Sequence, residues 1–247
     1  MGRDVLSDGL GAWLDGAAAP FSSAAGGWEI VWAALAGLWL GAVLDRLAQA
    51  YAEDLALGAP AAWSTLWTAA WAAHRRRAGL VRTTGAALLL SLTAGLCAAA
   101  CGPAYALLGL VLVVLAAIDA RSGLLPDALT LPLMVSGWLL GAQTVGVAVL
   151  VSVLTWASLG AVVCLYRWVR GRDGFGGGDI KCMAALAGWL GPGAACMILW
   201  LACVLGVAVA LVRRHHWSRP CPFGPCIALA ALAWLLLPMA ARLAVQS

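Results

Sequence analysis

The 247-residue sequence is short of charge: 11% of its residues are Asp, Glu, Lys or Arg, whereas 64% are hydrophobic. An ordinary soluble domain carries about 25% charged residues. A soluble fold of this length could not bury so much apolar surface, so the composition indicates that lipid is the main solvent. The net charge of +4 does not indicate nucleic acid, because the basic residues stand in short clusters between apolar runs, as they do in membrane proteins.

Several chemical motifs are also absent. None of the eight cysteines forms a CxxC pair, and most lie inside apolar runs. This pattern is typical of small core residues and supports neither a disulfide framework nor a metal site. His215 and His216 have no third ligand nearby in the sequence, so we predict no metal. The glycines before Asp179 are not followed by Gly-Lys-Ser/Thr, which excludes a Walker phosphate loop.

The apolar runs predict an all-α fold, a polytopic transmembrane helix bundle with about eight spanning helices. A helical crossing needs about 20 apolar residues. The runs cover about 28–50, 83–100, 103–118, 128–145, 147–166, 180–191, 194–212 and 223–241. Run 180–191 is short for a crossing. The predicted divisions are an extracytoplasmic tail over 1–27 without a signal peptide, a first transmembrane helix over 28–50, a cytoplasmic loop over 51–82 and a membrane core over 83–247.

The basic residues predict the orientation. If the N-terminus lies outside, every Lys and Arg except Arg3 and Arg242 falls in or beside a cytoplasmic loop. Loops on the cytoplasmic side of a membrane carry an excess of these residues. The eight-run model and the charge distribution therefore support each other.

Two aspartates stand at the edges of apolar runs. Asp119 ends run 103–118 and Asp179 begins run 180–191, so two crossings separate them and both face the same side. Ionisable groups at membrane depth are usually functional. Like charges held close do not both ionise easily, so such a pair supplies one acid and one base. The pair therefore predicts an aspartyl protease, in which one carboxylate activates water and the other carboxyl protonates the carbonyl oxygen.

Helix capping is the alternative explanation for the acidic residues. Asp is favoured at N-caps, which suits Asp179 and also Asp127, at the start of run 128–145. It does not suit Asp119, because negative charge is disfavoured at a helix C-terminus. The glycine-rich segment 174–178 either lets an extended substrate approach the backbone closely or is a plain connector.

Three motifs in order resemble the type IV prepilin peptidases, within the wider GxGD class of aspartyl proteases. IDARSGLLPDALTLPL, from Ile118 to Leu133, is similar to the family's first aspartate motif. GFGGGDIKCMAALAGWLG, from Gly174 to Gly191, is similar to the second. Pro-Phe-Gly-Pro, from Pro222 to Pro225, precedes the last helix as it does in the family.

The resemblance implies that Asp119 and Asp179 are the catalytic pair. The substrate-binding or supporting residues it implies are Gly176, Gly177, Gly178, Asp127 and Lys181. It also implies a prepilin or pseudopilin substrate, whose short basic leader is removed at the cytoplasmic face of the bacterial inner membrane. Such substrates belong to type IV pilus and type II secretion systems.

The N-terminal third departs from the family pattern. Relatives often carry two zinc-binding CxxC pairs in the first cytoplasmic loop, but residues 47–82 contain no cysteine, so we predict no zinc there. Gly37 to Leu47 is similar to a degenerate version of the family's first helix. Proteolysis by two carboxyl groups needs no cofactor, and this departure leaves S-adenosylmethionine-dependent N-methylation open.

Two other functions fit intramembrane carboxylates. One is a proton-coupled transporter, although transporters place their charges near the midplane and often contain inverted repeats. The other is a non-catalytic pilus or secretion assembly protein. Both aspartates at one interface favour the peptidase.

Overall fold

The computed structural model describes residues 28, 30–35, 80–171, 175–212 and 222–246. These residues form helices and connecting turns, with no strand among them. Residues 30–35 are helical. The longer helices are α4 (Leu80–Cys101), α5 (Pro103–Ser122), α6 (Asp127–Leu140), α7 (Val145–Arg170), α8 (Gly177–Leu190), α9 (Pro192–Val212) and α10 (Gly224–Gln246). The prediction of an all-α bundle is therefore confirmed.

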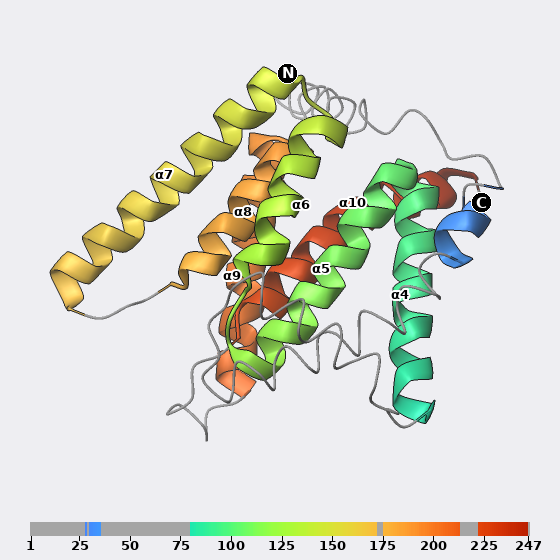
Figure 1. The fold of residues 1–247 in the computed structure, drawn as a ribbon, viewed down its shortest axis with the longest axis horizontal. Coiled ribbons are helices and arrows are strands. Elements are labelled where there is room, and N and C mark those ends of the chain that lie inside the picture. Colours follow the sequence, from blue (N-terminus) through green and yellow to red (C-terminus); the bar gives the residue numbers. More distant parts are fainter. Residues whose placement is uncertain (1–27, 29, 36–79, 172–174, 213–221, 247) are drawn as a thin grey trace, which may run out of the picture.

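The longer helices form one bundle with α7 at one edge and α4 near the other, where the short helix of residues 30–35 lies beside α4, as Figure 1 shows. α8 contacts α6, α7 and α9, while α5 contacts α4 and α10. Residues 34 and 91 also meet, because the Ser91 hydroxyl donates to the Ala34 carbonyl oxygen over 2.8 Å. Of the first predicted helix, 28–50, residues 36–50 lie outside the described part, as do the 1–27 tail and the 51–79 portion of the loop.

Three helices are long and apolar enough to cross a membrane: α5, α7 and α9. The chain is therefore a membrane protein. α6 and α8 have 14 residues each, or about 21 Å of helix, against about 30 Å of hydrocarbon in a bilayer. The count of about eight crossings stays a prediction.

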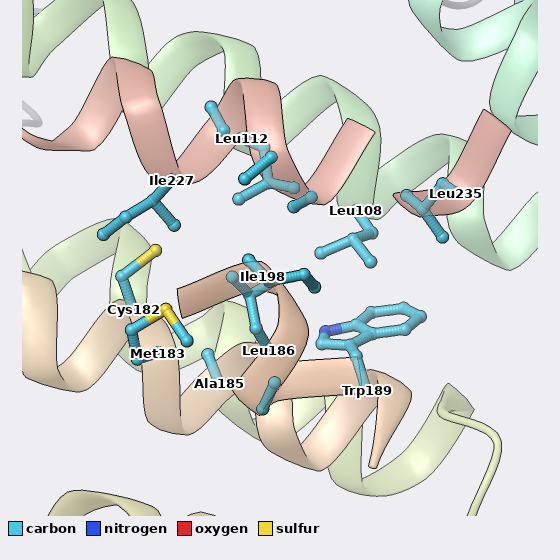
Figure 2. Packing of buried hydrophobic residues seen from close by; sticks show 14 of the residues in the cluster. Leu108, Leu112, Cys182, Met183, Ala185, Leu186, Trp189, Ile198, Ile227 and Leu235 are labelled. Atoms are coloured by element: carbon cyan, nitrogen blue, oxygen red, sulfur yellow. The ribbon is translucent and has the colours of Figure 1, made fainter. Parts of the chain in front are cut away.

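α8 is the most enclosed helix of the bundle. Its residues from Asp179 to Trp189 are buried except Lys181, which is partly buried. Figure 2 shows Cys182 and Met183 of α8 opposite Ile227 of α10, with Ile198 of α9 beside them. Small residues allow this close packing, since a Cβ atom at Gly188 would lie 2.6 Å from the Ser152 hydroxyl of α7.

Backbone turns explain where the helices end. Gly123 follows α5 in the left-handed conformation, with φ 66°, and its N–H donates to the carbonyl oxygen of Asp119 over 2.8 Å. Pro103 and Pro192 begin α5 and α9, where the missing N–H of proline is tolerated. α5 thus runs four residues beyond the predicted 118, and Asp119 lies inside its last turn rather than after it.

Candidate active site

Asp119 is buried near the end of α5, with 4% of its surface exposed. Its Oδ2 accepts a hydrogen bond of 2.7 Å from the backbone N–H of Gly224, which is 105 positions later in the sequence. Gly224 is the first residue of α10. The first carboxyl group therefore lies against the N-terminus of another helix.

Asp179 is the third residue of α8 and is 8% exposed. Gly176, not Asp179, is the N-cap of this helix, so the N-cap alternative for Asp179 is wrong. Its Oδ2 faces Gly176, since a Cβ atom there would lie 2.9 Å from that oxygen. Within the described part of the chain, its Oδ1 is buried and has no hydrogen-bond partner. A buried polar oxygen without a partner calls for an explanation, such as a catalytic role or a bound water.

The two carboxyl groups are close enough to interact electrostatically. Both also interact with the thiol of Cys182, one turn after Asp179 on α8. The structure thus brings Asp119 and Asp179 together at one end of the bundle, as the crossing parity indicated. Their catalytic role remains a prediction.

Asp127 and Lys181 form an ion pair across the two motifs. The Lys181 ammonium donates to both carboxylate oxygens of Asp127, at 2.7 and 2.6 Å. Asp127 is the first residue of α6, after the N-cap Pro126, so it is not the N-cap itself, and its carboxylate binds the lysine. The pair joins the start of α6 to the first turns of α8. Asp127 and Lys181 were both predicted to support the site, and the structure shows that they bind each other.

The three predicted glycines have different surroundings. A Cβ atom at Gly178 would lie 2.8 Å from Leu125 Cβ and 3.0 Å from the Leu125 carbonyl oxygen. Gly176 lies against the Asp179 carboxyl, whereas a Cβ atom at Gly177 would meet nothing within 4 Å. Gly177 and Gly178 belong to α8. The expectation of a glycine loop before Asp179 is therefore wrong for these two residues, and Gly178 serves close packing instead.

The Pro222–Pro225 motif, to which the sequence assigned no role in the site, contacts both aspartate motifs in the structure. In the structure Gly224 contacts Asp119, and the Phe223 ring packs edge-on against Phe175, with centroids 5.2 Å apart. The turn therefore touches both aspartate motifs. The presence of the motif in the sequence was the only indication that this turn matters, because its contacts with Asp119 and Phe175 depend on tertiary structure.

The described residues contain no group of three His, Cys, Asp or Glu side chains that could hold a metal ion. Cys97, Cys101, Cys182 and Cys226 are buried, as expected for core residues, whereas Cys164, Cys196 and Cys203 are exposed. His215, His216 and Cys221 lie outside the described part.

Fold and site define a helical membrane protein with two interacting carboxyl groups buried at one end of the bundle. Comparison with known proteins finds a related family: residues 106–211 match the model of the type IV leader peptidase family. This part of the chain is therefore similar to that family, in agreement with the resemblance drawn from the motifs. No solved structure matches the chain.

Curated proteins with similar sequences agree with this family match. The chain is 40% identical to the prepilin leader peptidase/N-methyltransferase of Aeromonas hydrophila over 139 residues, covering 52% of this chain and 48% of that protein. It is 37% identical to the Burkholderia pseudomallei (strain K96243) protein of the same name over 144 residues, covering 54% and 47%. For the Neisseria gonorrhoeae protein of that name the identity is 35% over 129 residues, covering 51% and 44%. The chain thus spans about half the length of the relatives it matches.

Proposed function

We propose that this chain is a membrane endopeptidase that removes the short basic leader of prepilins or pseudopilins. The observation that carries the proposal is the pairing of Asp119 with Asp179, two buried carboxyl groups on different helices that interact electrostatically. The family of residues 106–211 supports it, because both aspartates lie within the matched range.

The chemistry needs one proton shared by the two carboxyl groups. An ionised carboxylate takes a proton from water as the water oxygen attacks the peptide carbonyl carbon. The protonated partner donates its proton to the carbonyl oxygen. Adjacent carboxyl groups suit this division, because like charges held close oppose double ionisation. The unpartnered Oδ1 of Asp179 is available for the water or the substrate.

The proposed location is the cytoplasmic face of the bacterial inner membrane, with the N-terminus outside. The support is the clustering of Lys and Arg in the loops on the side of the two aspartates. The same charge rule holds the basic leader of a prepilin in the cytoplasm, so its scissile bond would reach the two carboxyl groups. We propose that proteolysis needs no cofactor. The proposed activity does not include N-methylation.

A cleavage assay with a co-expressed prepilin tests the proposal. In a strain lacking other prepilin peptidases, the wild-type chain should yield a trimmed pilin, read from the mass of its N-terminus. Asp119→Asn and Asp179→Asn should each abolish trimming while the protein still accumulates in the membrane. Ser158→Ala, at an exposed position of α7, is the control. Full trimming by either stable Asn variant would refute the assignment.

A further inference from the structure

The first turn of α10 has one N–H that points away from its own helix. The N–H groups of Cys226 and Ile227 both donate to the Phe223 carbonyl oxygen, at 3.0 and 3.1 Å. Pro225 has no N–H. The N–H of Gly224 donates instead to Asp119 Oδ2, at 2.7 Å. The sequence Phe-Gly-Pro at the helix start thus directs a donor that the helix cannot use toward a buried carboxyl group.

Only glycine fits at this position. A Cβ atom on residue 224 would lie 2.8 Å from Asp119 Oδ2 and 2.9 Å from Asp119 Cβ. Carbon atoms in ordinary contact are about 3.5–4.0 Å apart. The missing side chain therefore permits the approach of backbone to carboxyl.

The turn is also fixed to the second aspartate motif. The ring of Phe223 packs against Phe175, one residue before Gly176, with an interplanar angle of 65°. A Cβ atom at Gly206 of α9 would lie 3.2 Å from the Phe223 ring, so α9 also packs closely against this ring. The position of Gly224 is therefore tied to the segment that leads to Asp179.

The two carboxyl groups differ in how well their surroundings accept a negative charge. Asp119 lies in the last turn of α5, where the dipole of its own helix opposes a charge. The N-terminus of α10 offsets this with a donated hydrogen bond and a dipole of the favourable sign. Asp179 lies in the first turn of α8, where the helix dipole and the Gly176 backbone also favour a negative charge, but its Oδ1 is buried without a partner in the described part of the chain. An ionised oxygen in that state is costly, and protonation of the carboxyl group removes the buried charge.

We infer that the Pro222–Pro225 turn is a positioning element of the active site, through which Gly224 keeps Asp119 ionised and leaves the shared proton on Asp179. This inference rests on the proposed function for its catalytic meaning. Asp119 is then the base that takes the proton of the attacking water, and Asp179 the acid that protonates the carbonyl oxygen. When the C–N bond breaks, the leaving amine takes the proton from Asp119, and the intermediate's hydroxyl returns one to Asp179.

Infrared difference spectroscopy on the full chain in nanodiscs, with isotope-labelled aspartate and no substrate, locates the proton. At neutral pH the wild type should show the carbonyl stretch of a protonated carboxyl group. Asp119→Asn should keep this band and Asp179→Asn should lose it. The reverse pattern, a band in both variants, or no band in the wild type would overturn the inference.

A second variant tests the turn itself. Gly224→Ala should shift the band or move it to Asp119. It should also lower kcat about 10- to 100-fold with little change in KM, because this factor corresponds to the free energy of a hydrogen bond to a charged group. Gly160→Ala is the matched control, because a Cβ atom there meets nothing within 4 Å. An unchanged band and kcat in a folded Gly224→Ala protein would refute the role of the turn. If Gly224→Ala does not fold, the two Asn variants still decide which aspartate carries the proton.

The two proposals fail in different ways. If the infrared pattern holds but no prepilin is trimmed, the proposed function is wrong and the proton assignment stands. If trimming depends on both aspartates but the infrared pattern is reversed, the function stands and the assignment is wrong.

Discussion

Gly178→Ala is the substitution whose effect follows most directly from the structure. The new methyl group would lie 2.8 Å from Leu125 Cβ, 3.0 Å from the Leu125 carbonyl oxygen and 3.5 Å from Leu125 Cα. The first two distances are about 0.5–1 Å shorter than ordinary contacts. Since the neighbour is backbone as well as side chain, the first turn of α8 must move away from the segment between α5 and α6.

The expected magnitudes separate stability from catalysis. Overpacking costs about 1–3 kcal/mol, whereas replacing glycine by alanine in a helix gains about 1 kcal/mol. The net loss in free energy of unfolding should be about 0–2 kcal/mol, which a bundle of this size tolerates. Asp179 follows directly, and a misplacement of about 1 Å at a catalytic group lowers the rate about 100-fold. Cleavage should therefore fall far more than stability.

The assay is the initial rate of prepilin cleavage by purified protein, with thermal unfolding measured on the same sample. Gly177→Ala is the matched comparison, because it adds the same methyl group one residue earlier, where nothing lies within 4 Å. Its rate should fall much less than that of Gly178→Ala. Equal rates for the two variants, with both proteins folded, would refute the packing argument.

Three further predictions concern other parts of the molecule. The Asp127–Lys181 pair, with side chains 48% and 33% exposed, should contribute less than about 1 kcal/mol in a double-mutant cycle of unfolding, and the charge-reversed pair should recover part of it; a coupling of several kcal/mol would contradict this. Trp189→Phe should lower the free energy of unfolding by about 1–2 kcal/mol, since it removes the buried 2.8 Å bond to the Leu133 carbonyl oxygen; an unchanged unfolding midpoint would contradict this. The purified protein should bind S-adenosylmethionine weakly or not at all in calorimetry, because its N-terminal motif is degenerate; tight binding would show that the departures from the family do not matter.

The sequence predicted the helices well where glycine and proline mark their ends. Gly102-Pro103 and Gly191-Pro192 separate neighbouring runs, and the structure begins α5 and α9 at these prolines. The prediction ended α5 too early because hydropathy falls at Asp119, although the helix continues for one more turn. Ser122 supports that turn with a 2.9 Å bond from its hydroxyl to the Ile118 carbonyl oxygen. A fall in hydropathy indicates that the chain leaves the apolar environment, but the helix can continue beyond that point.

The site was predictable only in part. Counting crossings predicted that Asp119 and Asp179 face one side of the membrane, because each crossing reverses the chain direction, and the structure shows the two carboxyl groups close enough to interact. The contact of Asp119 with Gly224 depends on how α5 and α10 pack, and no local pattern records it. The partner of Asp127 was likewise hidden, since an acidic residue in the first turn of a helix satisfies the capping pattern whether or not it binds a lysine.

These contacts also show which groups are available to stabilise a negative charge at the two aspartates. Lys181 stands two residues after Asp179, but its ammonium is already bound by both oxygens of Asp127. The charge-stabilising contact at Asp119 comes instead from a backbone N–H at the start of α10. Backbone dipoles of a packed helix are fixed before the substrate arrives, so they need no reorganisation when charge develops. A side-chain cation at the same place would bind the carboxylate as a full ion pair and weaken it as a base. A helix N-terminus stabilises the charge by a smaller amount, as the inferred role of Asp119 as an ionised base requires.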